Sequence, residues 1–333
     1  MRLPILAAVA LFLAGPVLAD PFRLIVTEEE VPLVPNSILW LAQSEGYFDR
    51  AGVEVEIIPV KQTPMAVAAL RSGAGDMANI SLEALLNLHR EGADEVVAVH
   101  SSAKSLPYVI AARKDVTLEG LAGHSFGIGQ PGSLDQTLSA AVLAARGVSV
   151  EALTQVPLGQ PAARGQALMA GRVDATTLSI GAFLSLPERD DLHILIGVED
   201  YFAAAPVVSK VNVVQRVTLT TRADDLDKVL TALTLAARDY AADPALWAEA
   251  LKKARPDVAS ETLTAISPYF SGIWTVNGGV QKSEMLFAQS WYGRGLEQNS
   301  EYLVDPAKWL DLAPMDRVLA AIGTSDLGDP VSR

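Results

Sequence analysis

One pattern of residues occurs twice in this chain of 333 residues and constrains its fold more than any other feature. ALRSGAGDMANIS, Ala69 to Ser81, and ALMAGRVDATTLS, Ala167 to Ser179, share the spelling A-L-x-x-G-x-x-D-x-x-x-x-S. In each copy the spacing predicts a helix that ends at the glycine, and then a short strand that begins at the aspartate and ends at the serine. The repetition therefore predicts two related α/β units.

Strands and helices are expected to alternate around both copies. VEVEIIPV, from Val53, alternates apolar and acidic residues as a half-buried strand does. Ser133 and Gln136 have capping-box spacing at the start of a helix that stops at Gly147. A β-α-β-α order with short connections is typical of a mostly parallel sheet flanked by helices. The sequence thus predicts an α/β protein with two lobes.

The first residues have the layout of a secretory signal peptide. In MRLPILAAVALFLAGPVLAD, Arg2 precedes an unbroken apolar run, and Val17 and Ala19 occupy the small-residue positions before a cleavage site. The run is too short and too abruptly ended for a stable membrane span. We expect residues 1–19 to be removed by a cut after Ala19, and the mature protein to be periplasmic.

Composition excludes several classes of protein. The chain has no cysteine, which rules out disulfides, thiolate metal sites and cysteine nucleophiles. Its 39 acidic residues outnumber 26 Lys and Arg, for a net charge of −13, so its surface repels nucleic acid and anionic lipid. The mature chain has no further apolar run long enough to cross a bilayer. We expect no nucleic-acid partner and no membrane insertion.

The stretch GHSFG, residues 123–127, fits the G-x-S-x-G pattern of a serine-hydrolase nucleophile elbow. That elbow requires an apolar strand before the serine and a helix directly after it, whereas TLEGLA precedes this motif and IGQPGS follows it. The downstream His193 has its aspartates, Asp190 and Asp191, in its own short segment, unlike the partners of a triad. We interpret Ser125 as a strand residue and predict no catalytic residue.

Other chemistry has little support. GIGQPG lacks the spacing of a nucleotide-binding loop, and the acidic run Glu28 to Glu30 is interpreted as a solvated loop rather than a carboxylate pair. The histidines are scattered and lack metal-ligand spacing. They are His89, His100, His124 and His193. We expect no cofactor and no metal.

Several ordered segments together resemble a known family. EGYFDRAGVEVEIIPV, AVAALRSGAGDMANIS, VTLEGLAGHSFGI and ALMAGRVDATT resemble the periplasmic substrate-binding proteins of ABC importers for nitrate, sulfonates, taurine and thiamine-precursor pyrimidines. The resemblance runs from about Phe22 to the last helix. It implies the type II periplasmic binding protein fold, a hinge of crossing strands, ligand trapping by lobe closure and delivery to a permease in the inner membrane. A related pyrimidine-synthesising enzyme family needs a cysteine-rich motif that this chain lacks.

The expected domain boundaries follow the order of these segments. Residues 20–105 should form the first part of lobe 1, and residues 106–215 should form lobe 2. Residues 216–322 should complete lobe 1 with C-terminal helices, and residues 323–333 should be a flexible tail.

In open α/β sheets, ligands bind beyond the carboxyl ends of the strands, where helix N-termini offer partial positive charge and N–H donors. The predicted ligand-binding residues are Thr27, Asn36, Ser37, Ser81, Leu82, Ser101, Ser102, Gly132, Ser133, Leu134 and Ser179. Ser81 and Ser179 could equally cap helices, and the two roles are compatible. Aromatic residues that could stack on a flat ligand are Trp40, Tyr108 and Trp274. The loops leave open whether the ligand is an organic anion or a heterocycle.

Three functions are compared. The preferred one is a binding protein that captures a small organic anion or heterocycle, such as a sulfonate, nitrate, taurine or a pyrimidine, and performs no chemistry. A module that senses a ligand for a membrane receptor kinase would have the same fold and pocket. An exported serine hydrolase that uses Ser125 is the least supported.

Overall fold

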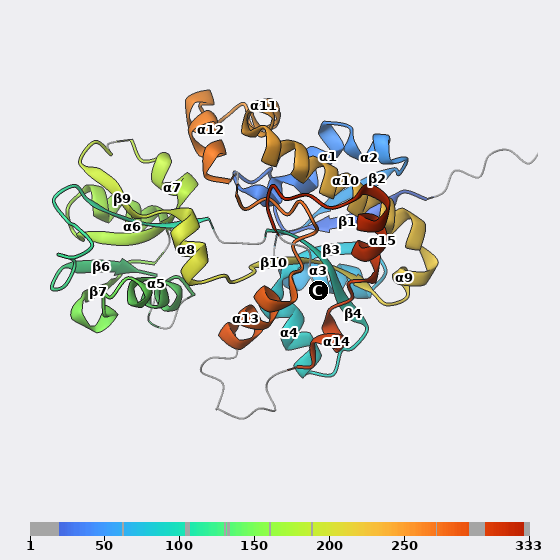
Figure 1. The fold of residues 1–333 in the computed structure, drawn as a ribbon, viewed down its shortest axis with the longest axis horizontal. Helices are drawn as coiled ribbons and strands as arrows, with labels where there is room; N and C mark the ends of the chain where they lie inside the picture. Colours follow the sequence, from blue (N-terminus) through green and yellow to red (C-terminus); the bar gives the residue numbers. More distant parts are fainter. Residues whose placement is uncertain are drawn as a thin grey trace, which may run out of the picture.

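The computed structural model describes residues 20–61, 63–103, 107–129, 131, 134–159, 161–187, 189–270, 272–292 and 304–329. The predicted signal peptide, residues 1–19, lies outside the described residues. The described chain forms two bodies, each built on one five-stranded sheet and flanked by helices (Figure 1). We call them lobe 1 and lobe 2.

Lobe 1 has the strand order β2-β1-β3-β10-β4. Its strands are β1 (Phe22–Val26), β2 (Val55–Pro59), β3 (Met77–Ser81), β4 (Val96–Ala103) and β10 (Lys210–Gln215). β1 pairs in parallel with β2 and β3, whereas β10 is antiparallel to both β3 and β4. Pairing of β10 with β3 places Lys210 opposite Ser81 and Asn212 opposite Asn79.

Lobe 2 has the strand order β7-β6-β8-β5-β9. Its strands are β5 (Tyr108–Arg113), β6 (Ser125–Ile128), β7 (Thr154–Pro157), β8 (Ala175–Ser179) and β9 (Leu192–Ile196). β6 is parallel to β7 and β8, and β5 is antiparallel to β8 and β9. Position by position, this is the order and direction of lobe 1, with the repeated segments ending in β3 and β8. The predicted duplication of an α/β unit is confirmed.

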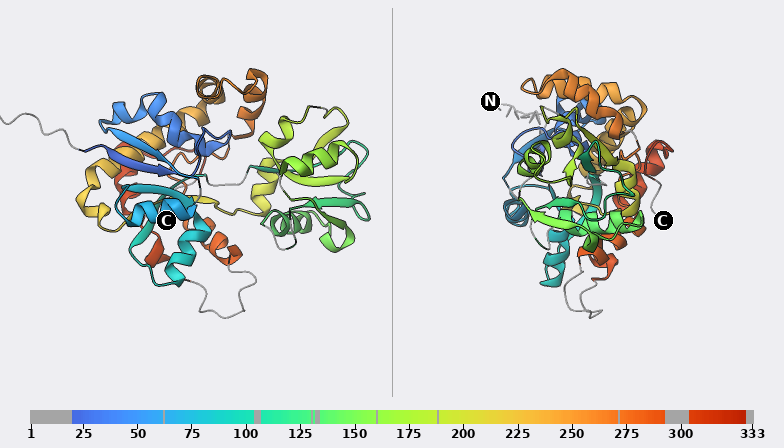
Figure 2. Two further views of the ribbon diagram at one scale, coloured as in Figure 1. Left: turned by 180° about the vertical axis from the view of Figure 1, so that it is seen from behind. Right: turned by 90° about the vertical axis from the view of Figure 1, so that its left-hand side faces the viewer.

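The helices flank both sheets (Figures 1 and 2). Lobe 1 has a 3₁₀ turn (Pro35–Ser37), α1 (Ile38–Ser44), α2 (Tyr47–Ala51), α3 (Thr63–Arg71), α4 (Leu82–Arg90), α9 (Thr218–Thr221), α10 (Ala223–Ala242), α11 (Pro244–Ala254), α12 (Ser260–Ile266), a 3₁₀ turn (Ser267–Phe270), α13 (Lys282–Tyr292), α14 (Pro306–Trp309) and α15 (Ala313–Ile322). Lobe 2 has α5 (Leu134–Ala145), a 3₁₀ turn (Val150–Ala152), α6 (Pro161–Met169), α7 (Ile180–Leu184) and α8 (Val198–Ala204).

The chain crosses between the lobes twice. It leaves lobe 1 after β4 and enters lobe 2 as β5, and it returns between α8 and β10. The antiparallel strand of each sheet is therefore the strand that follows a crossing. Our predicted range for lobe 2 ran to residue 215, but β10 pairs in the sheet of lobe 1 because its partners are β3 and β4. The other predicted ranges remain predictions.

The end of the chain is tied to lobe 1 as far as it is described. We expected a flexible tail from Gly323, yet Asp329 is buried and accepts hydrogen bonds from the backbone amides of Asn277 and Gly279, at 2.9 and 2.8 Å. The side-chain amide of Asn277 also donates to the carbonyl of Asp329, at 2.6 Å. These bonds hold residue 329 against the loop between the 3₁₀ turn Ser267–Phe270 and α13.

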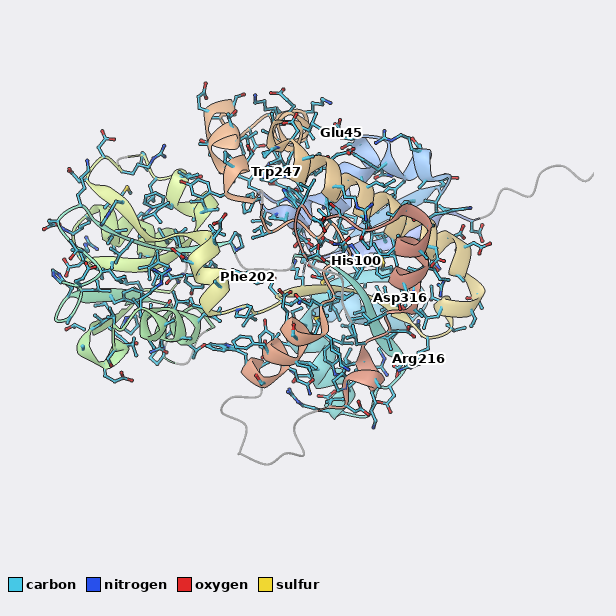
Figure 3. The ribbon with its side chains drawn as sticks, in the orientation of Figure 1. Glu45, His100, Phe202, Arg216, Trp247 and Asp316 are labelled. Atoms are coloured by element: carbon cyan, nitrogen blue, oxygen red, sulfur yellow. The ribbon has the colours of Figure 1, made fainter. Side chains whose placement is uncertain are left out.

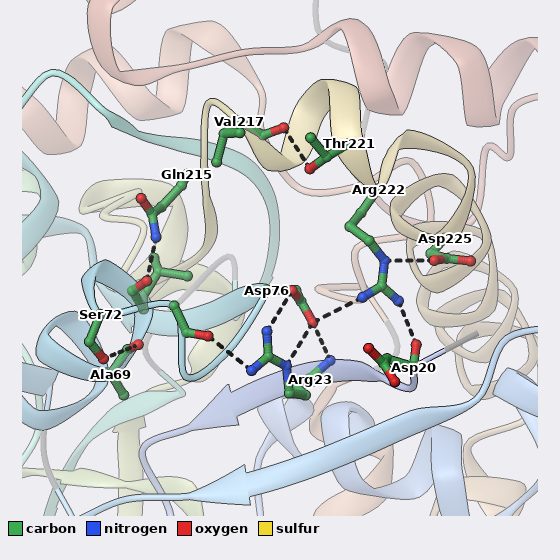
Figure 4. A network of polar contacts seen from close by, with 12 residues as sticks. Asp20, Arg23, Ala69, Ser72, Asp76, Gln215, Val217, Thr221, Arg222 and Asp225 are labelled. Atoms are coloured by element: carbon green, nitrogen blue, oxygen red, sulfur yellow. Dashed lines mark hydrogen bonds and ion pairs between the residues drawn. The ribbon is translucent and has the colours of Figure 1, made fainter. Parts of the chain in front are cut away.

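The aspartate of each repeat joins two neighbouring strands. In lobe 1, Asp76 accepts the backbone N–H of Arg23 at 2.8 Å and donates its own N–H to the Arg23 carbonyl. The guanidinium groups of Arg23 and Arg222 also contact its carboxylate (Figure 4). In lobe 2, Asp174 makes the same two backbone bonds with Ser125. The repeated aspartate is thus a structural tie between strands.

Asp174 is bound by more than the backbone. Its carboxylate also accepts the hydroxyl of Ser125 at 2.7 Å and lies 3.2 Å from Nδ1 of His124. Burial alone would raise the pKa of Asp174, but the hydrogen bonds from the Ser125 amide and hydroxyl and from His124 together lower it below 3.8. The ionised form is therefore the form that stabilises lobe 2.

We expect Asp174→Asn to lower the free energy of unfolding of lobe 2 at pH 7 by about 1 to 2 kcal/mol, because charge-assisted bonds are lost. A lowered pKa in the folded state means that the contribution is complete above the ordinary value and is lost as the pH falls through the folded value. The difference between the variant and the wild type should therefore shrink at acid pH. Urea unfolding followed by circular dichroism measures it, and the exposed Asp190→Asn is the control. Equal loss in both variants would contradict the prediction.

Candidate functional site

The carboxyl ends of the parallel strands mark one edge of each sheet. In lobe 1, this edge carries the residues after β1, the end of β3, the end of β4 and the start of the antiparallel β10. In lobe 2, it carries the ends of β6, β7 and β8 and the start of β5. The first crossing runs from the end of β4 to the start of β5, and the second runs from α8 to the start of β10. We call these two crossing segments the hinge, and the two sheet edges flank it.

A row of three buried amides runs across the sheet of lobe 1, near this edge. Nδ2 of Asn36 donates to Oδ1 of Asn79 at 3.1 Å, and Nδ2 of Asn79 donates to Oδ1 of Asn212 at 2.7 Å. Nδ2 of Asn212 then donates to Nδ1 of His100 at 2.8 Å and to the hydroxyl of Ser102 at 3.2 Å. We call Asn36, Asn79 and Asn212 the amide row. Every bond in it points the same way, from Asn36 to His100.

Glu28 and Lys210 meet at the Asn36 end of the amide row. Oε1 of Glu28 accepts from Nδ2 of Asn36 at 3.2 Å and also from Nζ of Lys210. The Lys210 ammonium donates to the hydroxyl of Thr27 as well, at 2.7 Å. Because Lys210 begins β10 directly after the second crossing, this ion pair joins the end of β1 to the hinge.

Three polar atoms of this region are buried without a hydrogen-bond partner among the described residues. They are Oε2 of Glu28, Oδ1 of Asn36 and Nε2 of His100. Buried polar groups in proteins are nearly always paired, so each unpaired atom needs an explanation. All three belong to residues of, or bonded to, the amide row.

His100 lies inside lobe 1 and is 1 % exposed (Figure 3). Burial lowers its pKa to about 3, so its imidazole is neutral at physiological pH. Since Oδ1 of Asn212 already accepts from Asn79, its Nδ2 faces His100, and Nδ1 of the histidine must be an acceptor. The remaining proton is on Nε2.

The edge of lobe 2 carries a buried cation. Nε and Nη2 of Arg164 donate to the carbonyl of Thr177 at 3.2 and 3.1 Å, and Nη1 lies 3.7 Å from Oδ2 of Asp135. The same oxygen of Asp135 accepts the backbone N–H of Gly129 at 2.8 Å. The hydroxyl of Thr177 bonds to that of Ser139 at 2.5 Å. Lobe 2 thus pairs one buried cation with one carboxylate.

The structure brings some of the predicted binding residues together and leaves others apart. Three of them join the polar network of lobe 1: Thr27 and Asn36 as described, and Ser102 through Asn212. The hydroxyl of Ser101 donates to the Lys210 carbonyl at 2.7 Å. Elsewhere, Ser37 is buried and accepts from the indole of Trp247, and Leu82 is fully buried. Gly132 and Ser133 lie outside the described residues, and Leu134 begins α5.

Ser81 and Ser179 occupy equivalent places in the two lobes. Each is the last residue of its strand and accepts a hydrogen bond from the third residue after it, Ala84 or Ala182, at 3.3 and 3.2 Å. Both therefore cap helices. The next N–H of each helix start donates to a crossing segment, Leu82 to Ser209 and Ile180 to Pro107. Both serines lie at the hinge edges, and ligand binding by them stays a prediction.

The three aromatic candidates differ in their surroundings. Tyr108 is half-buried at the start of β5 and packs edge-on against Tyr201, with ring centroids 5.7 Å apart. Trp40 is half-buried, and its Nε1 is a further buried atom without a described partner. Trp274 is 1 % exposed and packs against Tyr240 and Trp247. Its place is in the core, so we do not include it in the proposed site.

Sequence reasoning missed five members of the network: Glu28, Asn79, His100, Lys210 and Asn212. We interpreted Glu28 as part of a solvated loop, but its carboxylate is paired and partly buried, while Glu29 and Glu30 are exposed. A signal was present for Asn79, because it stands at the same position of the repeat as Thr177. A polar residue inside both apolar strands could have indicated a pair of matched sites.

Ser125 begins β6, as predicted for a strand residue, and lies at the edge of lobe 2 far from the hinge. Its hydroxyl donates to Asp174 rather than to an imidazole, so the Ser-to-His bond of a catalytic triad is absent at this residue. His193 bonds instead to the carbonyl of Val116, at 2.9 Å. The hydroxyl of Ser125 thus has a structural carboxylate as its partner instead of an imidazole.

The remaining features of the described chain add little chemistry. A hollow of about 300 Å³ lies at the far edge of lobe 2, and it is lined by Arg113, Lys114, Asp115, Leu168, Met169, Asp191 and Leu192. Among the described residues, His, Asp and Glu side chains form no group of three that could hold a metal ion. Within the same residues, every helix is too short or too polar to cross a membrane.

Two sheets of the same order, two crossings and a shared hinge define the periplasmic binding protein fold. A family model described as NMT1/THI5 like matches residues 36–246. The chain belongs to this NMT1/THI5-like family. No curated protein gives a significant sequence match.

Solved structures of transport proteins have the same fold. The periplasmic sulfonate-binding protein SsuA from Methylobacillus flagellatus matches with a TM-score of 0.71 and 14 % identity, over 94 % of this chain and 98 % of that chain. The periplasmic aliphatic sulphonate binding protein SsuA from Escherichia coli matches with a TM-score of 0.64 and 16 % identity, over 87 % and 91 %. The periplasmic nitrate-binding protein NrtA from Synechocystis matches with a TM-score of 0.60 and 12 % identity, over 94 % and 92 %.

Proposed function

We propose that this protein is the soluble substrate-binding component of an ABC importer. It is exported to the periplasm by the cleaved signal peptide of residues 1–19, captures a small organic anion or heterocycle between its lobes, and delivers it to a permease in the inner membrane. It carries out no catalysis. The fold, which it has in common with sulfonate-binding and nitrate-binding proteins, supports this role.

One observation carries the proposal. The two matched sheet edges that flank the hinge each hold buried or partly buried polar side chains, the amide row with Glu28 and Lys210 in lobe 1 and Arg164 with Asp135 in lobe 2. Ligands of open α/β sheets bind at this edge. Closure of one lobe on the other would bring both polar sets onto one small molecule.

A cognate ligand should stabilise the protein and close it. At a free concentration of 100 times its dissociation constant, it adds about 2.7 kcal/mol to the free energy of unfolding. A thermal-shift screen of sulfonates, nitrate, carboxylates, aromatic acids and pyrimidines identifies it, and small-angle scattering should then record a smaller radius of gyration. A complete screen without any stabilisation would argue against the proposal.

A further inference from the structure

The carboxylate of Glu28 is used unevenly. Oε1 accepts two hydrogen bonds, from Lys210 and Asn36, whereas Oε2 is buried and has no partner among the described residues. An ionised carboxylate can accept about four bonds, shared between its two oxygens. Lys210 and Asn36 both contact the same oxygen, so the second oxygen retains its full capacity to accept.

Asn36 is used unevenly in the same sense. Both of its side-chain hydrogen bonds are donated by Nδ2, to Glu28 at 3.2 Å and to Asn79 at 3.1 Å. A flip of the amide would turn an acceptor towards two acceptors, because Asn79 already donates its Nδ2 to Asn212. The network therefore fixes the amide, and Oδ1 of Asn36 is left as a second buried acceptor without a partner.

The charges found at the two edges are balanced. Lys210 is paired with Glu28, and Arg164 lies near Asp135. Each of these cations therefore already has a carboxylate partner, while two acceptors at the Glu28 end have no described partner. A ligand that contacts these two acceptors must supply hydrogen-bond donors. The donor that forms the strongest hydrogen bonds with a carboxylate is a protonated amine.

We propose that the ligand carries a protonated amine, and that this amine donates to Oε2 of Glu28 and Oδ1 of Asn36. The inference rests on the proposed function, since it assumes that a small molecule binds at the hinge. The expected substrates are then molecules that bear an amine, either zwitterions or cations, rather than simple anions. Glu28 and Asn36 are then the residues that recognise the amine.

Matched compounds test this on the wild-type protein. The pairs are 3-aminopropanesulfonate with propanesulfonate, 4-aminobutanoate with butanoate, and an aminomethylpyrimidine with the corresponding methylpyrimidine. Calorimetry should give the amine member of a pair an affinity about tenfold or more higher, as loss of a bond to a charged group implies. The trimethylammonium analogue keeps the positive charge but has no N–H, and it should lose this advantage.

The outcomes separate the two proposals. If amine-free members bind as tightly as their partners, or trimethylation has no effect, the protein is a binding protein but the amine inference is wrong. If a water molecule satisfies both acceptors, the same result is expected. If no member of any pair binds, the amine inference is wrong, and the complete thermal-shift screen decides the proposed function.

A substitution gives an independent readout. Glu28→Gln removes the negative charge and leaves Lys210 unpaired, so the amine member should bind about tenfold or more weakly while its amine-free anion binds more tightly. Glu29→Gln removes the same charge from the exposed neighbouring residue and should change neither affinity. A general loss of folding would weaken both ligands together, whereas the inference requires the preference to reverse.

Discussion

Replacing Gly279 with alanine is expected to lower the free energy of unfolding by about 3 kcal/mol or more. Gly279 has φ +66°, in the left-handed region that residues with a Cβ avoid, at a cost of about 1 to 2 kcal/mol. In addition, a Cβ at this position would overlap the backbone carbonyl oxygen of Ser101 and lie 2.5 Å from Cγ2 of Thr275. Backbone atoms cannot move aside as the end of a flexible side chain can.

The overlap matters because the loop of Gly279 closes the carboxyl end of β4. The amide of Ser101 donates to the carbonyl of Gly278 at 2.9 Å, and the amide of Gly279 donates to Asp329. Any shift of this loop would thus also displace Ser102 and disturb its hydrogen bond to the amide row. A weaker response to ligand should accompany the loss of stability.

Gly92 provides the matched control for Gly279→Ala. It also has positive φ, +84°, but a Cβ there would meet nothing within 4 Å. Gly92→Ala should therefore cost only the backbone strain, about 1 to 2 kcal/mol. Urea unfolding followed by tryptophan fluorescence compares the two variants. If they lose the same stability, the overlap with Ser101 is relieved in solution and the argument from packing is wrong.

The sequence was most informative where one physical cause acts locally. Glycines end the helices before β3 and β8, and the alternation of helices and strands predicts the parallel pairing, so the repeat was enough to predict two similar lobes. The roles of Asp76 and Asp174 were not predicted, because each ties its strand to another strand far away in the chain. The β-α-β pattern could not tell which residue lies opposite them.

The candidate site was predicted less well for the same reason. The amide row joins residues from the 3₁₀ turn before α1, the middle of β3 and the middle of β10, and only the strand register brings Asn212 opposite Asn79. A rule that looks at strand ends finds Thr27, Asn36 and Ser102 but passes over residues inside strands. Glu28 was missed because an acidic run is usually solvated, whereas here the first of three glutamates faces Lys210 and the other two face solvent.

His100 should make lobe 1 sensitive to acid. Its pKa is lowered from 6.5 to about 3 by burial, while in the unfolded chain it returns to its ordinary value. A group whose folded pKa is depressed contributes its full stability above the unfolded value and loses it as the pH falls towards the folded value. The window is therefore pH 6.5 to 3. Within it, the free energy of unfolding should fall by roughly 1 kcal/mol per pH unit from this residue alone.

His100→Asn tests this, because an asparagine oxygen can replace Nδ1 as the acceptor for Asn212 but does not titrate. The variant should be less stable than the wild type at pH 7, since the smaller side chain leaves a cavity. Between pH 6.5 and pH 4, however, its free energy of unfolding should fall by about 3 kcal/mol less than that of the wild type. Tryptophan fluorescence during urea unfolding reports on this lobe, as all 5 tryptophans lie outside residues 108–204. His124→Asn removes a partly exposed histidine from lobe 2, and its free energy of unfolding should fall with pH as steeply as that of the wild type. If the free energy of unfolding falls equally steeply with pH in both variants, the buried imidazole of His100 is not the group that makes lobe 1 sensitive to acid.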